Sequence, residues 1–150
     1  MALEKGIAEL VREFIDAGRP SSREQNIDDR RNGYVASAVL AGEQENRVWV
    51  EDIELEGMFF RVVSPLNATG ALPAVIYFHG GCFISGGFAT HDHQLRQLAY
   101  HSGCRVIAVQ YRLAPEHTFP AAHDDAEKGA LIIHRHAGQL GIDRSEEHTS

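Results

Sequence analysis

The chain has 150 residues, which is enough for one compact domain with its own hydrophobic core. Its formal net charge is −7, and because a negatively charged surface repels phosphate backbones, the composition disfavours a nucleic-acid partner. No segment is long and apolar enough to span a bilayer or to form the core of a signal peptide, so we expect a cytoplasmic protein without a membrane partner.

Two helices are predicted before any strand. Apolar residues at helical spacing indicate the first helix, which Gly18 and Pro20 should end; these residues are Leu3, Ile7, Leu10, Val11 and Phe14. Ser21 or Ser22 can begin the second helix in a capping box, and we expect that helix to end at Gly42. Because these helices precede the strands, they are predicted to lie on top of, or beside, a sheet.

The strands come in two kinds. Broadly alternating polarity over residues 48–55, a Glu56-Gly57 turn and a returning segment over residues 58–63 predict a β-hairpin. The segments 74–78 and 106–109 are apolar on both faces, which is typical of buried parallel strands.

A helix is predicted after each of the two buried strands. The first is expected to be capped by Thr90 or Asp92 and to end at Gly103, and the second to start at Pro120 and continue to about His136. The order strand, helix, strand, helix requires a right-handed crossover and predicts the α/β class.

The first buried strand runs directly into His79-Gly80-Gly81-Cys82-Phe83. Loops that leave the carboxyl ends of strands are where ligands meet an open α/β sheet. Glycines let backbone amides approach a substrate, and such amides can hold the oxyanion of a tetrahedral intermediate. Taken alone, the two glycines are explained equally well by the turn that joins a strand to a helix.

Further motifs follow this loop in a fixed order: Thr90-His91-Asp92, Tyr111-Arg112-Leu113-Ala114-Pro115-Glu116-His117, Phe119-Pro120-Ala121-Ala122 and Asp124-Asp125. With the loop they resemble the hormone-sensitive-lipase-like esterases, a branch of the α/β hydrolases that includes bacterial acetyl esterases. The resemblance covers residues 41–143. It implies the N-terminal portion of an α/β-hydrolase fold, with residues 1–42 as cap helices and 43–143 as the first part of the hydrolase domain.

The resemblance also implies an activity and roles for the loop. The expected parent protein is a serine carboxylic-ester hydrolase for short-chain acyl or aryl esters, with no metal or organic cofactor. The family's usual motif is HGGG, so the oxyanion amides should fall at Gly80, Gly81 and Cys82, while His79 braces the loop. Cys82 keeps the amide, but its side chain needs a negative φ or tolerated strain. Three residues are expected to fix the joint between the second buried strand and the last helix: Arg112, Glu116 and Asp124.

The chain contains no G-x-S-x-G nucleophile elbow. Ser85 and Ser102 lie in other patterns, and the serine, the acid and the histidine of the triad are all expected beyond Asp143. The chain by itself is therefore expected to be inactive. Residues 144–150 read like an in-frame translation of a sequencing adapter and are expected to be a non-native tail.

Alternative interpretations are a non-catalytic small-molecule-binding protein, as the plant gibberellin receptors of the same family are, and a truncated gene product without function.

Cys82 has no elbow and no assigned partner histidine, so it is not predicted to be a nucleophile. The pairs His91/His93 and His134/His136 are not predicted to bind metal, because helix positions two apart face different ways. The two cysteines, Cys82 and Cys104, form no CxxC pair. The oligomeric state is not predicted.

Overall fold

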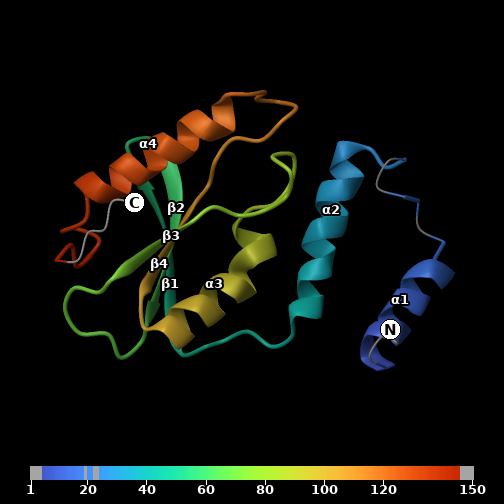
Figure 1. Ribbon diagram of the computed structural model, residues 1–150, viewed down its shortest axis with the longest axis horizontal. Helices are drawn as coiled ribbons and strands as arrows, with labels where there is room; N and C mark the ends of the chain where they lie inside the picture. Colours follow the sequence, from blue (N-terminus) through green and yellow to red (C-terminus); the bar gives the residue numbers. More distant parts are fainter. Residues whose placement is uncertain (1–4, 19, 22–23, 146–150) are drawn as a thin grey trace.

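The computed structural model describes residues 5–18, 20–21 and 24–145, and it forms three layers (Figure 1). A four-stranded sheet lies between helix α3 (Phe88–Ser102) on one face and helix α4 (Ala121–Arg135) on the other. Helices α1 (Lys5–Asp16) and α2 (Ile27–Ser37) lie to one side of these layers. In the described part of the chain, no helix is long and apolar enough to cross a membrane.

The sheet has the strand order β1-β2-β4-β3. Strands β1 (Val48–Leu55) and β2 (Met58–Pro65) form the predicted antiparallel hairpin. Its turn, Glu56-Gly57, places both residues at left-handed φ values of 50° and 76°, which match the twist of paired strands. Strands β3 (Ala74–Tyr77) and β4 (Arg105–Val109) pair in parallel as predicted. The predicted burial holds for β4 alone. None of the β3 residues is buried, since β3 lies at the edge of the described sheet.

Strand β4 is apolar on both faces because both faces are covered. Neighbouring residues of a strand point to opposite sides. Val106 therefore lies in the hydrophobic cluster with Leu95 of α3, and Ile107 lies in the cluster with Ile132 of α4. All four side chains are fully buried. The segment 106–109 is apolar on both faces because its side chains pack into two separate hydrophobic clusters.

The predicted start of the second helix at Ser21 or Ser22 is wrong. Ser21 and Glu24 close a single turn, in which the Ser21 backbone amide and hydroxyl donate to the Glu24 carboxylate at 2.9 and 2.8 Å. Helix α2 begins later, where Asn26 accepts a hydrogen bond from the Asp29 amide at 2.8 Å. A short 3₁₀ helix, η1 (Ala38–Ala41), then leads to the predicted end at Gly42. Ser22 lies outside the described residues, as does Leu3 of the first helix.

The predicted cap of α3 is also wrong by a few residues. The helix begins at Phe88 after Gly87, so Thr90 and Asp92 lie inside its first turns. The Thr90 hydroxyl nevertheless serves the helix start, because it accepts a hydrogen bond from the Gly87 amide at 3.0 Å. Gly103 ends the helix at a left-handed φ of 71°, as expected.

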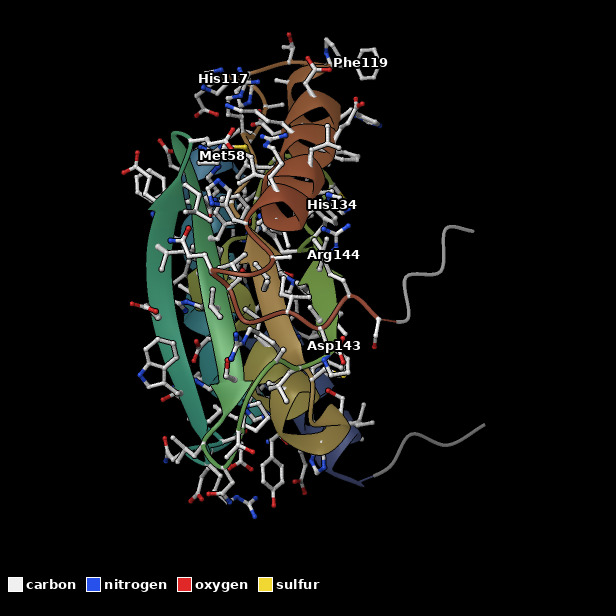
Figure 2. All side chains as sticks on the ribbon, turned by 90° about the vertical axis from the view of Figure 1, so that its left-hand side faces the viewer. Met58, His117, Phe119, His134, Asp143 and Arg144 are labelled. Carbon is white, nitrogen blue, oxygen red and sulfur yellow. The ribbon has the colours of Figure 1, made fainter. Side chains whose placement is uncertain are left out.

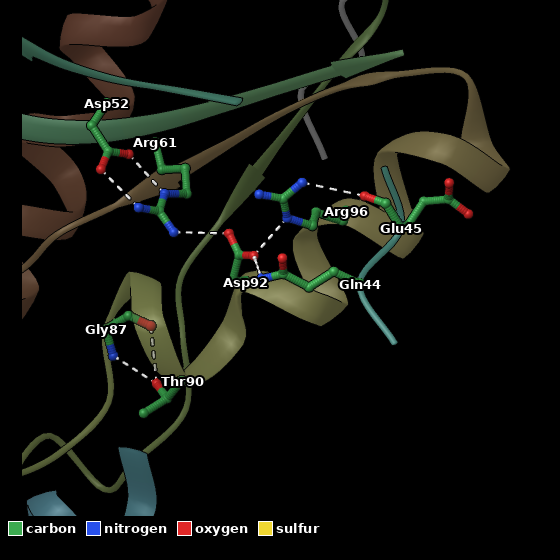
Figure 3. Close-up of polar contacts among 8 residues, drawn as sticks. All are labelled: Gln44, Glu45, Asp52, Arg61, Gly87, Thr90, Asp92 and Arg96. Carbon is green, nitrogen blue, oxygen red and sulfur yellow. Dashed lines mark hydrogen bonds and ion pairs between the residues drawn. The ribbon is translucent and has the colours of Figure 1, made fainter. Parts of the chain in front are cut away.

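The buried Asp92 anchors α3 to the sheet through a network of charged side chains (Figure 3). Its carboxylate accepts hydrogen bonds from Arg61 of β2 at 2.8 Å and from Arg96 one helical turn later at 2.5 Å. Gln44 donates to the same carboxylate at 2.9 Å, and Asp52 of β1 holds the other side of the Arg61 guanidinium. Since α3 starts at the end of the glycine-rich loop, this network also holds the end of that loop in place.

Candidate functional site

The glycine loop, residues 78–87, connects β3 to α3 and folds tightly on itself. The amides of Ile84 and Ser85 both donate to the Gly81 carbonyl oxygen at 3.1 Å. A Cβ at Gly81 would lie only 1.9 Å from the Ser85 carbonyl oxygen, and a Cβ at Gly86 would lie 2.4 Å from that of Gly80. The backbone therefore approaches itself so closely that these two positions accept only glycine.

Cys82 stands at the tip of the loop in a strained conformation. Its φ is +56°, and that of Phe83 is +62°, both in the left-handed region that side chains disfavour. Each such residue costs about 1–2 kcal/mol relative to the right-handed form. The Cys82 thiol is free and exposed. Of the two conditions expected from the sequence, a negative φ or tolerated strain, the structure adopts the second.

The backbone amides at the tip of the loop are unused. In the described part of the chain, those of Gly80, Gly81 and Cys82 donate to no other protein atom. They follow directly from the carboxyl end of β3, beside the parallel strand β4. An incoming oxygen anion could therefore accept hydrogen bonds here without displacing an internal partner.

His79 lies beneath the loop and is buried. Its ring stacks on that of Tyr111 with centroids 4.2 Å apart, and its Nδ1 lies 2.9 Å from the Gly80 carbonyl oxygen. The Tyr111 hydroxyl donates to the His79 carbonyl oxygen. Burial lowers the pKa of His79, and outweighs the opposing effect of the Gly80 carbonyl. The His79 ring therefore supports the backbone of the loop through Nδ1. Its Nε2 has no hydrogen-bond partner among the described residues.

The ring of His91, on α3, packs against the ring of His79 with centroids 5.5 Å apart. Its Nδ1 lies 2.8 Å from the Thr90 hydroxyl, and its Nε2 lies 3.3 Å from the hydroxyl of Tyr34 on α2. Burial lowers the pKa of His91 as well. Among residues 5–18, 20–21 and 24–145, no three His, Cys, Asp or Glu side chains are grouped so that they could hold a metal ion.

Arg31 of α2 makes a contact between this helix and the glycine loop that sequence reasoning missed. Its Nε donates to the Ile84 carbonyl oxygen at 2.8 Å, and its Nη2 donates to the Ala114 carbonyl oxygen at 3.0 Å. Its two terminal nitrogens also form a paired contact with the carboxylate of Glu116, each at 2.8 Å. No sequence signal marks this residue, because its partners are 53 to 85 positions away.

The segment between β4 and α4, residues 110–120, is held as the sequence predicts, but by a different acid. The Arg112 backbone amide and guanidinium donate to the carboxylate of Asp125, at 2.8 to 2.9 Å. Asp124, the predicted residue, is exposed, while Asp125 is buried on the inner side of α4. Adjacent helical residues point about 100° apart, so only one of the two carboxylates can face Arg112. Glu116 contributes to the joint through Arg31 instead.

Neither Ser85 in the loop nor Ser102 at the far end of α3 has the contacts of a nucleophile. The Ser85 hydroxyl donates to the Gly81 carbonyl oxygen at 3.1 Å, and the Ser102 hydroxyl donates to the Leu98 carbonyl oxygen at 2.6 Å. No described histidine is bonded to either hydroxyl. Both serines are therefore structural.

The open edge of β3 borders a hollow of about 670 Å³. Its lining includes Ile76 of β3, Ile133 of α4 and Ile142. Asp143 and Arg144 lie beside this edge, with His134 of α4 near them (Figure 2). Residues 142–143 run parallel to Leu72, which precedes β3: Leu72 and Ile142 form a parallel bridge, and the Asp143 amide donates to the Leu72 carbonyl oxygen at 2.8 Å.

Comparisons with known proteins agree on one family of folds. The family model of the α/β hydrolase fold matches residues 75–147. The chain is 36% identical to an arylesterase of Saccharolobus solfataricus over 81% of its own length and 40% of that enzyme. It is 32% identical to an ethyl acetate hydrolase of Pseudomonas putida over 95% of its own length and 49% of that enzyme.

A solved structure gives the same result in three dimensions. A hyperthermophilic esterase from the archaeon Pyrobaculum calidifontis superimposes with a TM-score of 0.80 at 35% sequence identity. The match covers 95% of this chain and 47% of the esterase. The chain thus spans about half the length of the relatives it matches.

Proposed function

Because the chain belongs to the α/β-hydrolase family of the hormone-sensitive-lipase-like esterases, we propose that the whole protein is a carboxylic-ester hydrolase and that this chain forms its N-terminal part. The observation that carries the proposal is the set of unused amides at Gly80, Gly81 and Cys82. They lie at the carboxyl end of the parallel strand β3, where an open α/β sheet binds its ligands.

In the proposed mechanism these amides hold the oxyanion. A serine supplied beyond Asp143 attacks the ester carbonyl carbon, and a histidine takes the serine proton while an acid orients the histidine. The carbonyl oxygen becomes negatively charged and accepts hydrogen bonds from the loop amides. Removing one donor of this kind lowers kcat by about 10²–10³ in well-studied hydrolases. His79 acts on the loop backbone and takes no proton from the substrate.

We propose short-chain acyl or aryl esters as the substrates. Two relatives support this, because their names specify aryl esters and ethyl acetate.

We also propose a cytoplasmic location, which the free thiols of Cys82 and Cys104 support, since secreted proteins more often pair their cysteines.

We propose that residues 1–42 form a cap, that residues 43–143 form the first part of the hydrolase domain and that residues 144–150 are not native. Residues 146–150 lie outside the described part of the chain. Sequencing genomic DNA of the source through the codon for Asp143 tests the last proposal. A natural reading frame that encodes Arg144 to Ser150 would refute it.

The function is tested on the full-length protein from that gene. We expect hydrolysis of p-nitrophenyl acetate, and its loss when the serine of a downstream G-x-S-x-G motif is changed to alanine. This chain alone should show no hydrolysis, because its sequence holds the glycine loop but no G-x-S-x-G nucleophile elbow. A full-length protein that lacks the motif, or binds such esters without turning them over, would refute the enzyme proposal in favour of a binding protein.

A further inference from the structure

Helix α2 reaches the glycine loop mainly through polar side chains. None of its residues is buried, and its aromatic contact, that of Tyr34 with His91, is made to helix α3 rather than to the loop. Arg31 is the residue of α2 that bonds to the loop itself, and its side chain is only 26% exposed. The position of the loop relative to the cap therefore depends on a guanidinium group.

Arg31 holds two segments that are far apart in the sequence. Its Nε bonds to the carbonyl oxygen of Ile84 in the glycine loop, and its Nη2 bonds to that of Ala114 in the segment after β4. The two segments also bond to each other, because the Ala114 amide donates to the Phe83 carbonyl oxygen at 2.8 Å. The guanidinium thus closes a ring of hydrogen bonds around the loop.

This ring adjoins the strained part of the loop. Cys82 and Phe83 have left-handed φ values, and Phe83 and Ile84 are the residues whose carbonyl groups the ring holds. Strained backbone persists only where its surroundings determine it more firmly than its own preferences do. Releasing the ring would let residues 82–84 relax, which would turn the unused amides away from their present directions.

We propose that Arg31 is a positioning residue that holds the glycine loop with its amides available, and so couples the placement of cap helix α2 to the oxyanion site; this inference rests on the proposed function. Arg31 touches no reacting atom. Its effect is transmitted through the Ile84 and Ala114 carbonyl oxygens.

The geometry requires arginine at this position. The planar guanidinium serves two carbonyl oxygens and both oxygens of Glu116 at once. A lysine ammonium offers a point charge on a flexible stem and cannot reproduce this fork. Misplacing catalytic donors by about 1 Å can cost up to about 100-fold in rate. We therefore expect kcat to fall at least about tenfold when the Arg31 guanidinium is removed.

The experiment compares Arg31→Gln with Arg30→Gln in the full-length protein. Arg30 is the matched control, since it precedes Arg31 on α2 and makes no side-chain hydrogen bond or ion pair with the described residues. Two milder changes accompany them, Arg31→Lys and Glu116→Gln, so that the comparison survives if Arg31→Gln does not fold. The measurements are kcat and KM for p-nitrophenyl acetate, and amide hydrogen exchange over residues 81–86.

We expect Arg31→Gln to lower kcat at least about tenfold with KM within about threefold, and to speed exchange at the amides of Ile84 and Ser85. Arg31→Lys should show a smaller loss of the same kind, and Glu116→Gln a smaller loss still, because it leaves both carbonyl bonds in place. Arg30→Gln should match the wild type.

Three results would overturn the inference: equal kinetics for Arg31→Gln and Arg30→Gln, a change confined to KM, or unchanged exchange over residues 81–86. A wild-type protein with no hydrolysis would refute the proposed function instead. The exchange comparison would then still decide whether Arg31 holds the loop.

Discussion

Replacing Cys82 by glycine should stabilise the full-length protein, because Cys82 has a φ of +56° that only glycine adopts without strain. Relief of that strain is worth about 1–2 kcal/mol. The greater freedom of glycine in the unfolded chain offsets about 0.4–1 kcal/mol of this gain. The exposed thiol should add little packing, so we expect a net gain of about 0.8 kcal/mol, and at most about 1.6 kcal/mol, in the free energy of unfolding.

The assay is urea denaturation of three full-length proteins: wild type, Cys82→Gly and Cys82→Ala. The alanine variant removes the thiol but keeps the Cβ, so it separates the chemistry of sulfur from the backbone strain. We expect Cys82→Ala to resemble the wild type and Cys82→Gly to exceed both. Hydrolysis by Cys82→Gly should be retained, because the backbone amide remains. If Cys82→Gly were no more stable than Cys82→Ala, the left-handed conformation would not be the source of strain.

Three further predictions concern stability and pH. Gly81→Ala should destabilise the protein and abolish hydrolysis, since its Cβ would lie 1.9 Å from the Ser85 carbonyl oxygen; a urea midpoint equal to that of the wild type would contradict this close approach. Asp92→Ala should cost about 3 kcal/mol in urea unfolding because it leaves its arginine partners at least partly unpaired, whereas a loss under about 1 kcal/mol would mean that the network contributes little. The ion pair with arginine lowers the pKa of Glu116 from 4.5 to about 2, so its stabilisation should be complete above about pH 5 and fade as the pH falls towards 2. The stability difference between wild type and Glu116→Gln, measured from pH 7 to pH 2.5, should therefore stay constant above about pH 5 and shrink below it; a constant difference over the whole range would contradict the shift.

Local patterns in the sequence correctly located most elements. The two-sided apolar segments became β3 and β4, and the Glu56-Gly57 turn closed the hairpin, because both signals depend on a few neighbouring residues. Helix starts were less accurate. Thr90 has a side chain typical of a cap but lies inside the helix, where its hydroxyl accepts a hydrogen bond from the amide of Gly87, the residue before the helix.

The sequence by itself also determined where the candidate site lies, because the glycine loop directly follows an apolar segment that forms a parallel strand. Only the tertiary structure decided how the loop is held. The left-handed φ of Cys82 and the choice of Asp125 over Asp124 depend on the backbone path and on the side of α4 that faces Arg112. The contacts of Arg31 join residues 53 to 85 positions apart, and no local pattern encodes a pairing that exists only after the chain has folded.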